Sequence, residues 1–195
     1  MTADLKAINL AHVDQTNESD LNLLQRLAKQ NGAEMAVKKD RLLIFKAGSA
    51  KTASGRDLPA ITLTRKDGDQ FRYSEQDRES DHTGVSASYQ DTGKAKREKS
   101  IAGEKGKVKH LKGTFANKEE AERASKAKMA EIKRQMAKFS ITTAYGIPKI
   151  STESPVKLQG FKGEVDKLKW IVEKATHSFT KNGGLATQLD LEAGL

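Results

Sequence analysis

The stretch DQTNESDLNLLQRLAKQNGAEM, which runs from Asp14 to Met35, predicts a short amphipathic helix between a polar cluster and a glycine. Asn17 or Ser19 can cap the first turn by accepting an otherwise unpaired backbone N–H. Gly32 can adopt the left-handed conformation that ends many helices. The apolar residues fall on one face at helical spacing, and we expect them to dock the helix onto an apolar surface; they are Leu21, Leu24, Leu27 and Ala28.

We expect β-strands on both sides of this helix. Apolar and polar residues alternate over Lys6–Gln15, which favours a strand. Beyond the glycine, Glu34–Val37 and Leu42–Phe45 flank a polar turn and predict a β-hairpin. Small and polar residues over Ala47–Arg56 are typical of a linker.

A longer β-rich region follows the linker. Ile61–Arg65 and Gln70–Ser74 enclose the turn sequence Lys-Asp-Gly-Asp, which predicts a second hairpin. We expect Gly84–Tyr89 and Lys107–Leu111 to be strands, and the lysine- and glycine-rich Asp91–Gly106 to be a loop. Near the C-terminus the predicted strands are Ile141–Tyr145, Pro155–Gln159, Leu168–Ser178 and Leu185–Leu191, with a turn at Gly183-Gly184 and the Trp170 face directed to the core.

One long helix interrupts these strands. Asn117 and Glu120 form a capping box, and strong helix formers continue from Lys118 to Phe139. Most of its circumference is charged, so we expect it to lie on the surface of a sheet. The sequence therefore predicts an α+β fold: an antiparallel β-barrel-like domain with a helix–hairpin subdomain and one long surface helix. We place the subdomain at residues 1–56 and the barrel-like domain at 57–195, with the basic helix inserted at about 117–139.

Composition argues against several kinds of site. Without cysteine, the chain has no disulfides, thiolate ligands or cysteine nucleophile. The four histidines show no metal-binding spacing, and the glycines form no phosphate loop. The acidic run Glu75–Asp81 is more simply a solvated turn than a pair of catalytic carboxylates. We therefore expect no catalytic, cofactor or metal site and no small-molecule substrate. No run approaches the roughly 20 apolar residues of a membrane helix, so we expect no membrane partner.

The net charge of +9 is confined to one stretch of the chain. Residues 94–138 hold 15 Lys or Arg and 6 Asp or Glu, so the remaining residues are balanced. Such a stretch can attract phosphate groups, and Lys126, Lys133 and Arg134 are candidates for phosphate or partner contacts. A solvated surface is the simpler interpretation, because charge runs usually face water. Base stacking is not expected, since Phe115 is the one aromatic residue in the stretch.

Two stretches resemble a known family of phage proteins. The first holds Gln15, the triplet Glu-Ser-Asp and the leucine-rich helix, and it is similar to a signature of baseplate hub proteins of contractile-tailed phages and of the spike proteins of type VI secretion. The second, from Gly160 to Glu192, resembles the C-terminal strands of the phage late control protein D family. The residues that carry the resemblance include Glu18, Ser19, Asp20, Arg26, Gly32, Trp170, His177 and Gly184.

The resemblance implies a structural function without catalysis, in which the helix is a structural brace that packs through Leu21, Leu24 and Leu27. In this family three copies form the ring at the centre of the baseplate, which joins the sixfold tail tube to the threefold spike. The implied partners are the chain itself as a homotrimer, the tail tube and the spike, with DNA passing non-specifically through the lumen. The implied location is the virion tail baseplate of a phage or prophage, assembled in the host bacterial cytoplasm. Family chains carry another β-barrel domain upstream, so we expect this chain to be a C-terminal fragment of the hub protein.

Two other functions fit parts of the sequence. A basic nucleic-acid-binding regulatory protein would also have a pI of about 9.6, and would bind DNA as a monomer with strong salt dependence. A cell-wall hydrolase of the tail tip would require a carboxylate such as Glu18. The hub is the leading hypothesis, because the resemblance covers nearly the whole chain and its motifs occur in order.

Overall fold

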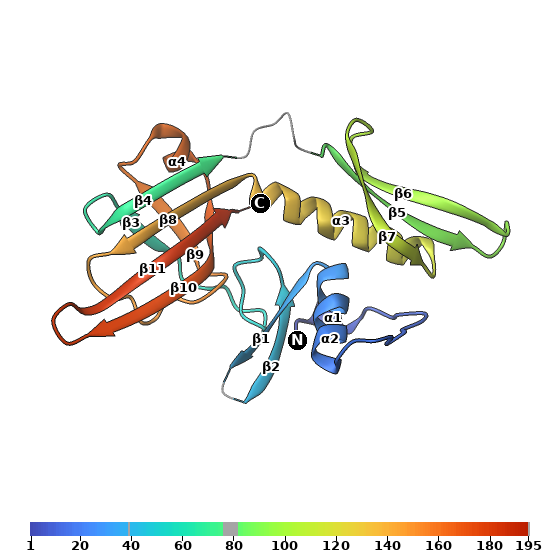
Figure 1. Cartoon of the computed structure of the whole chain (residues 1–195), viewed down its shortest axis with the longest axis horizontal. Helices are drawn as coiled ribbons and strands as arrows, with labels where there is room; N and C mark the ends of the chain where they lie inside the picture. Colours follow the sequence, from blue (N-terminus) through green and yellow to red (C-terminus); the bar gives the residue numbers. More distant parts are fainter. Residues whose placement is uncertain (39, 76–81, 195) are drawn as a thin grey trace. The chain divides into compact units, whose positions relative to one another are not determined.

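The computed structural model describes residues 1–38, 40–75 and 82–194, which form two compact units (Figure 1). The first unit comprises Met1–Ala47, Ala53–Gly55 and Arg78–Ile132. The second, here called the barrel unit, comprises Gly48–Thr52, Arg56–Asp77 and Lys133–Leu195. This division differs from the predicted boundary at residue 56, because the central strands and most of the long helix belong to the first unit.

The N-terminal part of the first unit is a helix and a hairpin. After the short α1 (Ala3–Lys6), the helix α2 (Asp20–Gln30) leads into β1 (Ala33–Lys38) and β2 (Arg41–Lys46), which pair antiparallel as predicted. Lys39, in the predicted turn, lies outside the described residues. The predicted strand at Lys6–Gln15 is wrong: no described strand pairs with it, and Ile8 and Leu10 are half-buried in a groove that α2 also lines.

A three-stranded sheet forms the rest of the first unit. Its central strand is β5 (Gly84–Asp91), which pairs antiparallel with β6 (Lys96–Gly103) and parallel with β7 (Val108–Phe115). β5 and β7 confirm predicted strands. The loop predicted over Asp91–Gly106 is wrong, because half of this stretch forms β6. β6 is an exposed, lysine-rich strand at the sheet edge, and in sequence such a strand resembles a loop. Edge strands nevertheless commonly carry such charges.

The long helix α3 (Lys118–Gln135) begins at the predicted capping box. The Asn117 side chain accepts the backbone N–H of Glu120 at 2.9 Å. Ala121 is fully buried against Ala87 and Tyr89 of the three-stranded sheet. The helix ends before the predicted Phe139, because the chain enters the barrel sheet, where burial of that ring in the core outweighs local helix propensity.

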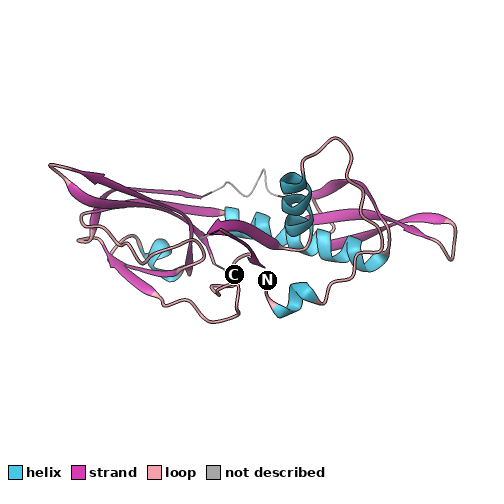
Figure 2. Ribbon diagram, turned by 90° about the horizontal axis from the view of Figure 1, so that it is seen from below, coloured by secondary structure: helices cyan, strands magenta, loops and turns pink. Residues whose placement is uncertain are grey.

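The barrel unit is one curled six-stranded sheet (Figures 1 and 2). In spatial order its strands are β3 (Ile61–Thr64), β9 (Pro155–Gln159), β10 (Trp170–Thr180), β11 (Gly184–Ala193), β8 (Ala137–Thr143) and β4 (Gly68–Glu75), with the short helix α4 (Gly163–Lys167) between β9 and β10.

The two edge strands of this sheet, β3 and β4, are consecutive in the chain. Asp67 forms the predicted turn between them by accepting the backbone N–H of Thr64 at 2.6 Å. The predicted pairing is wrong, because β3 pairs parallel with β9 and β4 antiparallel with β8. The turn brings the edges together at one end, so the sheet curls toward closure and confirms the barrel-like α+β fold.

The core of the barrel unit is aromatic at its centre. Trp170 is 1% exposed, as the sequence predicts for its strand face, and its indole N–H donates to the carbonyl of Val165 at 2.9 Å. Its ring centroid lies 5.8 Å from that of Phe139. The other large residues that are almost fully buried here are Leu63, Ile141, Leu158, Val172, Leu189 and Leu191. Within the described residues, no helix is long and apolar enough to cross a membrane.

Candidate assembly site around the E-S-D turn

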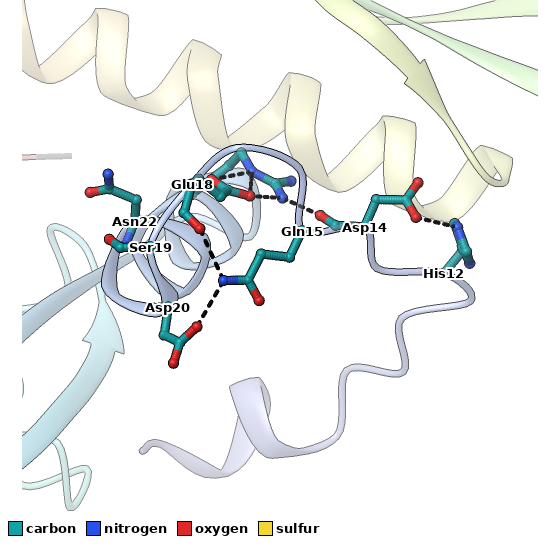
Figure 3. Close-up of polar contacts among 8 residues, drawn as sticks. His12, Asp14, Gln15, Glu18, Ser19, Asp20 and Asn22 are labelled. Carbon is teal, nitrogen blue, oxygen red and sulfur yellow. Dashed lines mark hydrogen bonds and ion pairs between the residues drawn. The ribbon is translucent and has the colours of Figure 1, made fainter.

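The E-S-D turn, formed by Glu18, Ser19 and Asp20, is held by hydrogen bonds at the start of α2 (Figure 3). Asn17 before it has φ of +53°, a conformation that asparagine tolerates in turns. Ser19 is extended, and its hydroxyl accepts the backbone N–H of Asn22 at 3.3 Å. Of the two predicted caps, Ser19 is therefore the cap. Asp20 lies in the first turn, where the helix dipole favours negative charge.

An ion pair fixes the turn to the middle of the helix. Arg26 donates from Nη2 to Glu18 Oε1 at 2.6 Å, and its Nε lies 3.2 and 3.3 Å from the two carboxylate oxygens. Nη2 also donates to the carbonyl of Asp14 at 2.8 Å. The hydrogen bonds from Arg26 hold the pKa of Glu18 below its ordinary value of 4.5. A planar guanidinium that bonds a carboxylate through two nitrogens gives the pair a defined geometry.

The segment before the turn is tied to it by Gln15. Its amide Nε2 donates to the carbonyl of Glu18 at 3.0 Å and to Oδ1 of Asp20 at 2.7 Å (Figure 3). The ion pair between His12 and Asp14, at 2.9 Å, is mostly exposed, so water screens it. The ordered part of the site is therefore the stretch from Asp14 to the first turns of α2.

The leucine stripe is only partly covered within this chain. Leu24 and Leu27 line a groove of about 370 Å³ in the first unit, together with Leu5, Ile8 and Leu10. Leu24 is 36% exposed and Leu21 is 54% exposed. Leu21 is therefore not buried by the described residues, contrary to the expectation for a docked stripe. A brace function for Leu21, Leu24 and Leu27 stays a prediction.

The C-terminal end of α2 contacts the long helix inside the first unit. Gly32 has φ of +68°, as the sequence predicts, and a Cβ at this position would lie 3.4 Å from the Ala127 side chain. Beside it, Asn31 accepts the Nε–H of Arg123 at 3.2 Å. Gly32 thus combines a backbone conformation that favours glycine with a close approach to α3.

Comparison with known proteins identifies the family. The sequence profile of the family "Phage tail baseplate hub (GPD)" matches residues 3–183. The chain belongs to this family. It is 37% identical to the probable baseplate hub proteins of Escherichia phage 186 and Escherichia phage P2, and each alignment covers 98% of this chain. The chain spans 59% of the length of these two relatives.

Two solved structures of tail proteins have the same fold as this chain, although their sequence identity to it is low. The tail protein from Neisseria meningitidis MC58 matches with a TM-score of 0.66 at 12% identity, over 94% of this chain and 57% of that one. The 43 kDa tail protein of prophage MuSo2 from Shewanella oneidensis matches with a TM-score of 0.63 at 16% identity, over 92% and 56%.

Three further residues that carry the resemblance lie in the barrel unit. Trp170 and His177 lie on β10 in the barrel unit, and Gly184 forms the turn into β11 with φ of +66°. His177 Nδ1 lies 2.9 Å from the Thr187 hydroxyl, a structural hydrogen bond. Within the described residues there is no group of three or more His, Asp or Glu that could hold a metal ion. The run Glu75–Asp81 lies outside the described residues except for its first member.

The three basic candidates divide into two kinds. Lys126 and Lys133 are exposed on α3, and Lys126 lies 3.7 Å from Glu122. Arg134 is buried and donates to Glu192 at 2.8 Å. The charge of Arg134 is therefore already paired inside the barrel unit, and its phosphate or partner contact stays a prediction. The phosphate contacts of the two lysines stay predictions.

Sequence reasoning missed two buried glutamates. Glu192, the partner of Arg134, lies one residue before the end of β11, and Glu153 is buried beside three backbone N–H groups of residues 48–50. In the sequence, Glu153 lies in a Ser-Thr-Glu-Ser turn that is typical of solvent-exposed loops. The available signal was a glutamate near the end of the apolar strand at Leu189–Leu191, where a buried carboxylate requires a basic partner.

Proposed function

We propose that this chain is a structural part of the hub at the centre of a contractile phage tail baseplate, where it joins the tail tube to the spike. The family match over residues 3–183, with 37% identity to the baseplate hub proteins of phages P2 and 186, is the observation that carries the proposal. The partners are further copies of the chain, as a homotrimer, together with tube and spike proteins. Assembly takes place in the bacterial cytoplasm, and the chain has no catalytic activity.

The packing of the barrel unit supports a role as a rigid structural component. Its core is continuous from Leu63 to Leu191, and residues of all six strands contribute to it or pack against it. A close-packed core transmits strain with little deformation. Such a barrel can keep its shape while neighbouring proteins bind its faces and strand edges, which is what a hub between two different symmetries requires.

We assign the E-S-D turn a positioning role in assembly. The bonds from Arg26 to Glu18 and to the carbonyl of Asp14 fix the segment before α2, and Leu24 and Leu27 cover the groove beneath it. The brace therefore presents one defined surface of the first unit to a partner. Ordering this segment before binding reduces the entropy lost on association.

Co-expression with the tube and spike proteins of the same phage or prophage tests the proposed function. Purification through a tag on this chain, followed by native mass spectrometry, should recover a complex that contains tube or spike protein. Recovery of the isolated monomer alone would contradict the hub proposal. The regulator alternative predicts instead that the monomer binds duplex DNA, with log affinity falling against log salt by about 0.9 for each phosphate contact.

Arg26→Gln tests the positioning role within the same experiment. This change removes the ion pair to Glu18, so the yield of the complex should fall by a factor of about ten or more. Lys138→Gln is the matched control, since it removes an exposed ion pair, to Glu173 at 3.1 Å, from the surface of the barrel unit. Equal yields of the Arg26 and Lys138 variants would show that the turn has no role in assembly.

A further inference from the structure

Three charged side chains are buried together in the barrel unit, outside the E-S-D site. Arg134, Glu153 and Glu192 are 6%, 4% and 6% exposed. Burial of charges is costly unless each is paired or hydrogen-bonded, so such a cluster requires a reason. The burial of Glu153 is compensated by hydrogen bonds from backbone N–H groups of residues 48–50, which are far away in sequence.

Residues 48–50 wrap their backbone around the carboxylate of Glu153. Gly48 donates its N–H to Oε1 at 3.1 Å, and Ser49 and Ala50 donate to Oε2 at 3.0 and 3.4 Å. Gly48 has φ of +70° and Ala50 of +53°. Successive N–H groups that converge in this way form a concave anion site, and the anion is supplied by the protein itself. The energy of this binding offsets the strain of Ala50 in the left-handed region.

Arg134 connects this carboxylate site to the end of α3. Its Nε donates to Glu192 at 2.8 Å, and a Cβ on Gly48 would lie only 3.0 Å from its Cδ. The aliphatic stem of the arginine therefore packs directly on the Gly48 backbone. Burial raises the pKa of Glu153, while the three amide donors and the charge of Arg134 act in the opposite direction.

The position of the cluster along the chain gives it a function. The chain passes from the first unit to the barrel unit at three places, two of which lie between Ala47 and Gly48 and between Ile132 and Lys133. Gly48 and Arg134 lie within two residues of these crossings. We propose that Glu153, Arg134 and Glu192 form a latch that fixes these two crossings to the barrel unit. The latch holds residues 48–50 and Arg134 in fixed positions on the barrel unit. These positions would persist when force acts on the two connecting segments in an assembled tail.

Amide hydrogen exchange in the full chain tests this latch. In Glu153→Ala the amides of Gly48, Ser49 and Ala50 lose their acceptor, and their exchange should accelerate at least tenfold. Amides of the core strands β8 and β11 should exchange at unchanged rates. Glu153→Gln keeps the size of the side chain but has only one acceptor oxygen. It should therefore accelerate exchange either at Gly48 or at the pair Ser49 and Ala50. If the alanine variant does not fold, this glutamine variant alone tests whether Glu153 holds residues 48–50.

Two further variants sharpen the test. Gly48→Ala places a Cβ against the Arg134 side chain at a residue with positive φ. It should therefore accelerate exchange at the same three amides, although no charged group is removed. Glu173→Gln is the matched control, because it makes the same chemical change in an exposed ion pair of the same unit and should leave these amides protected. Unchanged exchange at residues 48–50 in the Glu153 variants would overturn the proposal. Acceleration spread equally through the barrel core would also overturn it, since the cluster would then serve general stability alone.

Discussion

Replacement of Arg134 by methionine separates a structural arginine from a phosphate contact. The methionine preserves most of the aliphatic volume but removes the guanidinium that bonds Glu192 at 2.8 Å. Both side chains are more than nine-tenths buried, at 7% and 8% exposure, so the remaining carboxylate cannot recover its hydration without disrupting the core. If Arg134 were a surface contact for DNA, the same change would leave stability nearly unaffected.

The expected cost follows from the geometry of the pair. Removing one partner of a buried ion pair typically costs about 3–5 kcal/mol, because it leaves an uncompensated charge. That is a large part of the roughly 5–15 kcal/mol by which a folded domain is stable. Replacing both partners, as in Arg134→Met with Glu192→Leu, should return the stability to within about 1 kcal/mol of the original, since similarly sized apolar residues often substitute for such pairs.

Urea unfolding followed by tryptophan fluorescence measures this cost. The chain has one tryptophan, Trp170, which is 1% exposed in the barrel core, so its emission reports the barrel unit specifically. The difference in the unfolding free energy, taken at constant slope against urea, gives the cost of each variant. DNA affinity measured against salt should show the same slope for Arg134→Met as for the unmodified chain.

A loss below about 1 kcal/mol in Arg134→Met would refute the reasoning, as would a double variant that is less stable than the single one. Either result would mean that the pair lies in a more hydrated environment than its burial indicates. A reduced salt slope in the single variant would restore Arg134 as a phosphate contact.

Three further changes test the E-S-D site. Ser19→Ala removes the cap of α2 and should cost about 1 kcal/mol in unfolding free energy, measured by circular dichroism in urea. Leu24→Ala should cost about 1–2 kcal/mol in the same assay, below the usual range for a buried leucine, because Leu24 is 36% exposed; a larger loss would show that the groove is closed in solution. Since Arg26 lowers the pKa of Glu18, this carboxylate stabilises the folded state above pH 4.5 and the contribution disappears as the pH falls through its lower folded pKa. Glu18→Gln should therefore weaken the acid-induced loss of stability, and an unchanged profile from pH 7 to pH 2 would contradict this.

Elements set by local sequence were predictable. The cap at Ser19 and the left-handed Gly32 depend on a few neighbouring residues, and the hairpins β1–β2 and β10–β11 are closed by short turns. β9 has the predicted bounds, and β10 and β11 lie within about two residues of theirs. In each case the pattern and the contact it predicts lie close together in the chain.

Several of the errors concern contacts that are distant in sequence. Ile61–Thr64 carries a strong hairpin signal, yet its neighbour is the parallel strand Pro155–Gln159, which no turn signal can indicate. Phe139 follows a run of helix formers, but burial in the barrel core decides its conformation. Arg134 and Glu153 are ordinary surface residues by sequence, and they become buried partners because the fold brings residues 48, 134, 153 and 192 together.

The parallel pairing of β3 with β9 also determines the order in which the protein can fold during its synthesis. About 90 residues separate the end of β3 from the start of β9, and the three-stranded sheet and α3 are encoded between them. At a bacterial translation rate of about 5–20 residues per second, the ribosome needs about 5–20 s to cover that distance. During this interval the first unit can complete its own sheet, while β3 and β4 emerge early and wait with unpaired backbone groups. The barrel therefore closes last, and the moment at which its final strand, β11, leaves the ribosome sets the earliest time at which the barrel unit of a newly made chain can be complete.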